Sequence, residues 1–172
     1  YTDDGAEHTY SLKEAHRFTR PGCLHCPDFN RQLYLETLGF TQYTVVEQKE
    51  EGDKVKRTVE AKPRLNMPGP VAKLLGNSFG FREIGTVDRA KNSYEWHWVT
   101  SVLSDKLSVK GTMRVEPAGE KRSKRIVNIT IEAKIFGVGG LVESSAEKDM
   151  RAGWDASASF TNRYAAKKRS EA

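Results

Sequence analysis

The hydrophobic pattern of the chain is helical before Thr41, alternating over most of its length, and helical again after Leu141. A helix is predicted from Pro27 to Leu38, because apolar residues recur there at roughly helical spacing: Phe29, Leu33, Leu35 and Leu38. Pro27 suits a first turn and Gly39 a left-handed stop, so both ends of this segment support the prediction.

Alternating patterns predict antiparallel strands in the middle of the chain. A short first strand is expected at residues 6–12, and two further strands, joined by a turn at Glu51-Gly52-Asp53, follow Thr41. A short helical segment at 67–76 precedes four longer alternating runs: Phe79–Asp88, Tyr94–Leu103, Lys106–Glu116 and Arg125–Phe136. Successive strands with short connections indicate an antiparallel meander.

The connection between the two central strands predicts how they pair. A two-residue turn at Ser104 and Asp105 would place Trp96 opposite Met113, and Trp98 opposite Gly111. This register also pairs Tyr94 with Val115, Thr100 with Val109, Val102 with Leu107, Glu95 with Arg114 and His97 with Thr112. The large apolar residues except Val99 and Leu103 then share one face, and charged or polar residues occupy the other.

The carboxyl end of the chain predicts one long amphipathic helix, at about 141–168. No proline interrupts this segment, and residues suited to a buried face recur at helical spacing: Val142, Ala146, Met150, Trp154, Ser157, Ala158, Thr161 and Tyr164. The expected architecture is a single α+β domain over 1–172, with an irregular stretch within 1–26 and short helices near the N-terminus. A curved antiparallel sheet of six to seven strands holds the long terminal helix against its concave face.

Composition limits the functional classes. The 172 residues are 37% hydrophobic and 30% charged, which is typical of a soluble globular domain. No run of about 18 apolar residues is present, so no membrane-spanning segment is predicted. The net charge of +5 is too small and too dispersed to indicate nucleic acid as a partner. The chain begins at Tyr1 without Met, so both the cytoplasm and, after removal of a targeting segment, an organelle stay open as compartments.

The segment IFGVGGLVE (135–143) has the strand, glycine turn and helix order of a nucleotide-binding loop. The third glycine of that fingerprint is replaced by Val142, and no strand follows the helix. We therefore interpret the glycines as a flexible joint. Gly137 and Gly139 are expected to leave an opening beside a cavity, so that Gly139→Val should slow ligand exchange before it harms folding.

Cys23 and Cys26 have the spacing of a zinc or redox pair, and His16 and His25 lie nearby. A structural zinc site needs four ligands, and the chain holds no second cysteine pair. The two cysteines are either a redox pair or two ordinary thiols, and the sequence leaves their role open. No metal or cofactor is predicted.

Glu83 is the most informative carboxylate. It shares parity with Phe81 and Gly85, which places it on the apolar face of its strand. A carboxylate facing an apolar interior can bind a polar ligand head or an arginine. In the alternative interpretation Ile84 points inward and Glu83 is solvated.

Three segments resemble the START-like helix-grip (SRPBCC) superfamily, and more narrowly a mainly bacterial branch of it that is a domain of unknown function. They are PDFNRQLYLETLGF (27–40), PGPVAKLLGNSFGFREIG (68–85), and LSDKLSVKGTMRVEPAG with IEAKIFGVGGLVE (within 103–143). The resemblance implies a cavity between sheet and terminal helix that holds an apolar ligand. Residues 13–26 depart from the compact helix expected there, which affects the cavity opening.

The function we expect is the binding or transport of a hydrophobic molecule, such as a lipid, sterol, isoprenoid or aromatic compound. The predicted ligand-binding residues are Phe81, Glu83, Tyr94, Trp96, Trp98, Val109, Met113, Ile129, Ile131, Gly137, Gly139, Met150 and Trp154. One alternative is a non-catalytic accessory subunit of a larger assembly; a second is a cyclase- or hydrolase-like enzyme that uses Glu83 or Tyr94 as acid or base. The basic segments 121–125 and 167–169 are either contacts for anionic lipid or a protein complex, or solvated ends.

Overall fold

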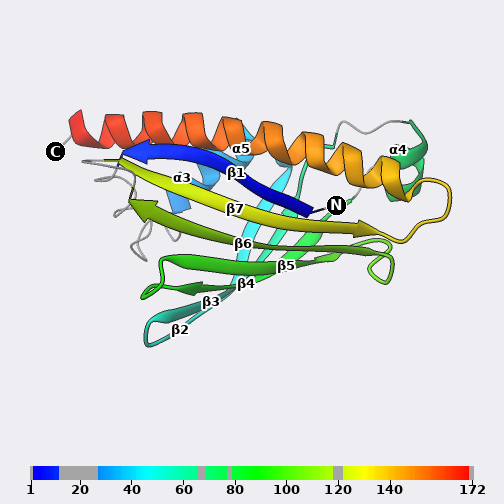
Figure 1. The fold of residues 1–172 in the computed structure, drawn as a ribbon, viewed down its shortest axis with the longest axis horizontal. Helices are drawn as coiled ribbons and strands as arrows, with labels where there is room; N and C mark the ends of the chain where they lie inside the picture. The colour runs from blue at the N-terminus through cyan, green and yellow to red at the C-terminus, as the bar shows by residue number, and fades with distance from the viewer. Residues whose placement is uncertain (1, 12–26, 66–68, 77–78, 118–121, 171–172) are drawn as a thin grey trace.

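The computed structural model describes residues 2–11, 27–65, 69–76, 79–117 and 122–170, which form a curved sheet with one long helix along it (Figure 1). The sheet has seven antiparallel strands in the order β1-β7-β6-β5-β4-β3-β2. The strands are β1 Thr2–Ser11, β2 Gln42–Glu51, β3 Lys54–Lys62, β4 Phe81–Asp88, β5 Ser93–Thr100, β6 Leu107–Pro117 and β7 Arg122–Ala133. The helices are α3 Pro27–Asn30, the π-helical turn η1 Arg31–Thr37, α4 Gly69–Leu75 and α5 Gly139–Ser170. The predicted α+β helix-grip architecture is confirmed.

Strands β2 to β7 form the predicted meander, and β1 extends the sheet by pairing with β7. The first strand begins earlier than the predicted 6–12, at Thr2. The β2–β3 turn contains Gly52 with φ of 59°, a conformation that favours glycine. The predicted irregular segment 13–26, with Cys23 and Cys26, lies outside the described residues.

The predicted pairing of β5 with β6 has the right faces but the wrong register. Tyr94 lies opposite Met113, Trp96 opposite Gly111, and Trp98 opposite Val109, a shift of two residues. The cause is the connection: β5 ends at Thr100, and backbone bonds from Lys106 and Leu107 to the carbonyl of Leu103, whose φ is 55°, form a longer turn than the predicted two residues. A shift of two preserves which side chains face inward.

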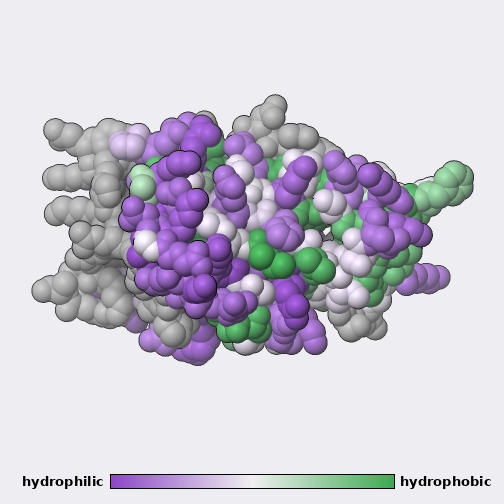
Figure 2. All heavy atoms as spheres, turned by 90° about the horizontal axis from the view of Figure 1, so that it is seen from below, coloured by the Kyte–Doolittle hydropathy of each residue, from purple (hydrophilic) through white to green (hydrophobic). Residues whose placement is uncertain are grey.

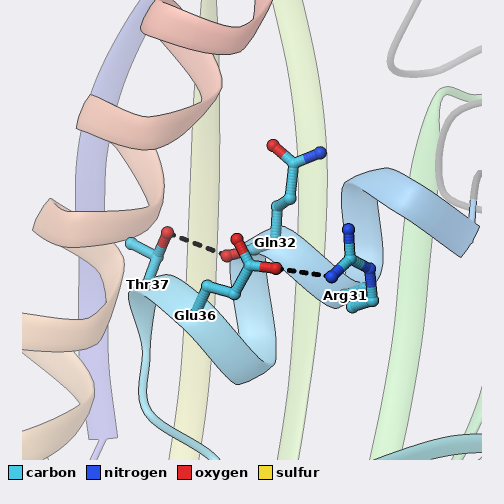
Figure 3. A network of polar contacts seen from close by, with 4 residues as sticks. All are labelled: Arg31, Gln32, Glu36 and Thr37. Carbon is cyan, nitrogen blue, oxygen red and sulfur yellow. Dashed lines mark hydrogen bonds and ion pairs between the residues drawn. The ribbon is translucent and has the colours of Figure 1, made fainter.

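The helix predicted from Pro27 to Leu38 is α-helical only in its first turn. From Arg31 onward, groups five residues apart meet: Arg31 Nη1 donates to the Glu36 carboxylate across 2.7 Å, and Thr37 Oγ1 donates to the backbone carbonyl of Gln32 across 2.9 Å (Figure 3). The amide of Leu38 likewise donates to the carbonyl of Leu33. A π-helical turn changes which residues share a face, and π-bulges occur frequently at functional sites.

This change of period corrects the predicted buried face of the segment. Leu35, expected on the apolar side, is 37% exposed. Tyr34 instead stacks on Tyr43 of β2, with ring centroids 3.8 Å apart. Phe29, five residues before Tyr34, packs against Phe160 of α5.

Helix α5 lies along the concave side of the sheet and contacts β1, β7 and η1 (Figure 1). The helix begins at Gly139. Near its start the Glu143 carboxylate accepts a 2.8 Å bond from the amide of Ala133, which ties this end of the helix to the end of β7. None of the described helices is long and apolar enough to cross a membrane.

Buried apolar side chains of the described residues form clusters distributed along the space between sheet and helix. One cluster near the start of α5 joins Val71 and Leu75 of α4 to Val142. Another, near its far end, contains Phe29, Leu33 and Phe160. The remaining two lie on the sheet, around Val55, Val87 and Tyr94, and around Val109, Ile129 and Ile131. Because the hydrophobic core is divided in this way, room is left between the clusters.

Candidate functional site

A cavity of about 570 Å³ lies between the concave face of the sheet and helix α5. Strands β2 to β7 supply its floor, α5 its roof, and η1 one wall. Its lining is mainly apolar, with a small number of polar and charged side chains among the described residues: Asn30, Thr37, Arg57, Arg64, Glu83, Asp88, Asn92, Ser93, Arg125, Asp149, Ser157 and Thr161, together with three tyrosines. An apolar lining with few polar groups is typical of a small-molecule site.

Stacked aromatic rings form much of one side of the cavity. Tyr34 stacks on Tyr43, and Phe81 stacks on Trp98, each pair with centroids 3.8 Å apart. Phe40 bridges the two pairs by edge contacts to Tyr34 and Phe81. The wall therefore offers a flat apolar surface.

Glu83 points inward and is bound on both carboxylate oxygens. Tyr94 donates its hydroxyl to Oε1 across 2.6 Å, and Trp98 donates Nε1–H to Oε2 across 3.0 Å. Ile84 is 38% exposed on the other face, so the structure decides between the two orientations that the sequence left open.

A glycine makes the bond between Tyr94 and Glu83 geometrically feasible. Gly85 lies between them in β4, and a Cβ added there would overlap the ring and hydroxyl of Tyr94. Gly111 has the same relation to the indole of Trp96, its cross-strand partner. Both rings can lie flat on the cavity floor because these two positions carry no side chain.

Arg57 brings a positive charge into the same group. It is 5% exposed, and its Nη2 donates to the hydroxyl of Tyr43 across 3.0 Å. Arg57 alternates with Val55 and Val59 along β3, which places it on the buried face of that strand. A buried guanidinium is tolerated only where nearby groups stabilise its charge, and here these are Tyr43, Tyr94 and Tyr34, followed by the carboxylate of Glu83.

Burial and charge shift the pKa values of the cluster in a consistent direction. Burial, followed by the charge of Glu83, raises the pKa of Tyr34. The same two causes raise the pKa of Tyr94 well above its usual range. Burial and the neighbouring Tyr34 do the same to the pKa of Tyr43. Burial lowers the pKa of Arg57, but the surrounding tyrosines and Glu83 outweigh it and the pKa rises. At neutral pH the phenols are thus neutral and the guanidinium is charged.

The cavity lining includes every predicted ligand-binding residue except the two glycines of the joint. Phe81, Glu83, Tyr94, Trp96 and Trp98 come from β4 and β5; Val109, Met113, Ile129 and Ile131 come from β6 and β7; Met150 and Trp154 come from α5.

Gly137 and Gly139 are not among the described residues that border the cavity. Gly137 adopts φ of 79°, as a turn glycine does, whereas a Cβ added at Gly139 would overlap the carbonyl of Ala133. The joint is therefore closed by backbone contact at Gly139. Gly139→Val would strain the backbone, so that substitution does not serve as a test of ligand exchange.

Sequence reasoning missed several polar lining residues, among them Tyr34, Tyr43, Arg57 and Arg125. Arg57 and Arg125 could have been found, because each shares the parity of the apolar residues of its strand. Arg125 belongs to the basic segment 121–125, for which we expected either a contact surface or a solvated end, and it borders the cavity from within β7. Tyr34 gave no such signal, since its position follows from the π-helical turn.

Metal binding finds no support in the described part of the chain, where no three His, Cys, Asp or Glu side chains come together. Cys23 and Cys26 lie outside that part. The groups that line the described cavity can make apolar contacts, stack on a flat ligand and form directed hydrogen bonds.

Comparison with solved structures identifies the class of fold as START-like. The chain is similar to the Zhui aromatase/cyclase from Streptomyces sp. R1128, with a TM-score of 0.62 and 10% identity over 95% of each chain. It is also similar to a START superfamily protein from Mycobacterium smegmatis, with a TM-score of 0.58 and 14% identity over 95% of this chain and 97% of that one. For Ara h 8.0201 the TM-score is 0.57 and the identity 14%, over 94% and 97% of the two chains.

The family itself is defined by sequence. Residues 24–165 match the family described as "Protein of unknown function (DUF2505)", and the chain belongs to this family. No curated protein matches the chain in sequence. The similar solved structures and the family match together confirm the predicted resemblance to the START-like superfamily.

Proposed function

We propose that this protein binds a hydrophobic small molecule in the cavity between its sheet and helix α5. The observation that carries the proposal is the cavity itself, about 570 Å³ with a mainly apolar lining, which has the size and character of small-molecule sites. The similar structures give secondary support, because the name of one of them, an aromatase/cyclase, implies a small organic substrate.

Room in a protein interior normally destabilises it, because side chains around a void lose contacts. Here the lining side chains come from several elements, and the aromatic pairs hold one wall without filling the space. A lipid, sterol, isoprenoid or aromatic compound would restore those contacts. We thus infer that the bound form is the more stable one.

An enzymatic role is a weaker alternative. Both oxygens of Glu83 accept hydrogen bonds, and the raised pKa of Tyr94 makes it a poor base at neutral pH. A role as an accessory subunit or at an anionic membrane also stays a hypothesis. It depends on residues 13–26 and on the basic ends, much of which lies outside the described residues.

The proposal is tested in two steps. Native mass spectrometry of gently purified protein should reveal a co-purifying small molecule. Titration with the neutral fluorescent probe N-phenyl-1-naphthylamine should then show saturable binding to protein freed of that molecule.

Two variants of α5 provide a matched comparison. Ala146 borders the cavity, and Ala166 is exposed on the same helix. Ala146→Phe should weaken probe binding by roughly tenfold, because the new ring occupies ligand space. Ala166→Phe should leave it unchanged. Equal affinities for both variants, or no saturable binding by the parent protein, would overturn the proposal.

A further inference from the structure

Arg57, Tyr43 and Tyr34 form a chain of hydrogen-bonding groups inside the cavity. Arg57 donates to the Tyr43 oxygen across 3.0 Å. Because that oxygen accepts from Arg57, the Tyr43 proton is left to turn toward the hydroxyl of Tyr34, whose ring stacks on that of Tyr43. Their rings are nearly parallel, with an interplanar angle of 8°. The chain thus leads from a buried cation to the hydroxyl of Tyr34.

Tyr34 ends this chain with a donor. A Tyr34 oxygen that accepts from Tyr43 keeps its own O–H proton to donate, and the residue borders the cavity from η1. Hydrogen bonds in series polarise one another, and a charged donor at one end strengthens the last donor. Tyr34 therefore offers a strengthened O–H donor in largely apolar surroundings.

The burial of Tyr34, more than the charges around it, opposes a negative group at this position. Burial and the carboxylate of Glu83 raise the pKa of Tyr34, and they outweigh Arg57 and Arg125, which lower it. Negative charge on the Tyr34 oxygen is thus less stable than in water, and an anion bound beside it would meet the same surroundings. A neutral oxygen acceptor matches the donor without that penalty.

We propose, resting on the function proposed above, that the Tyr34 hydroxyl binds the carbonyl oxygen of the cavity ligand. The ligand class is then an apolar ketone, enone or quinone, and neither a carboxylic acid nor a plain hydrocarbon. The aromatic wall of the Tyr34–Tyr43 and Phe81–Trp98 pairs favours a flat molecule of this class, because stacking adds to apolar contact.

Three probes of nearly the same shape test this proposal: 2-acetonaphthone, 2-ethylnaphthalene and 2-naphthoate. Each is competed against N-phenyl-1-naphthylamine at pH 8. The ketone should bind about fivefold more tightly than the hydrocarbon, as a hydrogen bond contributes. The ionised naphthoate should bind at least roughly tenfold more weakly than the ketone, since its charge is not matched.

Three variants then test whether the preference for the ketone depends on the relay, the chain of groups from Arg57 through Tyr43 to Tyr34. Tyr34→Phe keeps the stacked ring but removes the donor, so the ratio of ketone to hydrocarbon affinity should fall toward one. Tyr43→Phe interrupts the relay and should lower the ratio partly. Tyr164→Phe, which makes the same change at a tyrosine of α5 that is not among the residues bordering the cavity, should keep the parent ratio. Thermal unfolding of each variant shows that it is folded.

The possible outcomes separate this inference from the proposed function. If the ketone and hydrocarbon bind equally in the parent protein, or naphthoate binds as well as the ketone, the carbonyl assignment is wrong while ligand binding stands. If Tyr34→Phe keeps the parent ratio, Tyr34 is not the donor and the inference fails. If neither the fluorescent probe nor the naphthalenes bind, the proposed function fails and the inference with it.

Discussion

Strands β3, β4 and β5 carry charged residues on their concave face and exposed apolar residues on their convex face. A sheet that simply covered a hydrophobic core would show the reverse. On the concave face Arg57 is only 5% exposed and Glu83 borders the cavity. On the convex face Ile84 and Val99 are 38% and 46% exposed. Charged residues are rarely buried unless they are paired, so their presence inside marks the concave face as a site for recognition as well as packing.

Each face also has a hollow, and the two are similar in size. The inner cavity measures about 570 Å³ and the outer hollow about 550 Å³. The outer one is lined largely by polar side chains of the convex face, including Glu95, His97, Lys110 and Thr112. Figure 2, which views the molecule from the side opposite α5, shows a largely hydrophilic surface interrupted by hydrophobic side chains. Size alone does not distinguish the two, whereas the apolar lining and the linked polar groups of the inner cavity do.

The largest effect expected from this contrast follows substitution of Arg57. Arg57→Met should lower the free energy of unfolding by about 3 kcal/mol, because it removes the buried bond to Tyr43 and the positive charge near the inward-facing Glu83. Lys56→Met, at the next position and exposed on the convex face, should change it little. Urea unfolding of both variants measures the difference, and equal effects would mean that the two faces are energetically alike.

A smaller effect is expected from a single methyl group on the cavity floor. Gly85→Ala would push the Tyr94 ring off the strand and break its bond to Glu83, at a cost of about 2 kcal/mol in stability. Thr86→Ala changes the adjacent outward-facing residue of the same strand and serves as the control. A Gly85→Ala protein as stable as the Thr86→Ala protein would show that Tyr94 moves without penalty.

The smallest effect is a pH dependence that arises from the buried Tyr43 phenol of the inner face. The pKa of Tyr43 is raised above its ordinary value of 10.0 in the folded protein, so the unfolded chain loses that proton first. Stability linked to this phenol is fully present below pH 10 and falls as the pH rises beyond it, by up to about 1.4 kcal/mol per pH unit.

Tyr43→Phe should therefore reduce the loss of stability between pH 10 and pH 11, measured as the shift in the urea midpoint. Tyr164→Phe provides the comparison at a tyrosine outside the cavity lining. A parent protein whose midpoint falls no faster than that of Tyr43→Phe would contradict the burial assigned to this phenol.

Much of the fold could be predicted because its signals are local. The alternation that places Trp96 and Trp98 inward and the helical period of α5 depend only on neighbouring residues, and both are observed. The register between β5 and β6 was predicted wrongly because it depends on their connection, where Leu103 takes a positive φ that the sequence does not predict. The error did not change the predicted faces, since a shift of two residues keeps parity.

The candidate site divides in the same way. Its apolar lining and the inward position of Glu83 follow from parity within single strands, although parity alone left Ile84 as an alternative. The polar cluster is different, because Tyr34, Tyr43 and Arg57 come from η1, β2 and β3 and meet only when the sheet curves under the helix. Periodicity along a chain determines which way a side chain points. Only tertiary packing determines which side chains from distant segments lie within hydrogen-bonding distance, and here that packing includes a π-helical turn that local propensity does not predict.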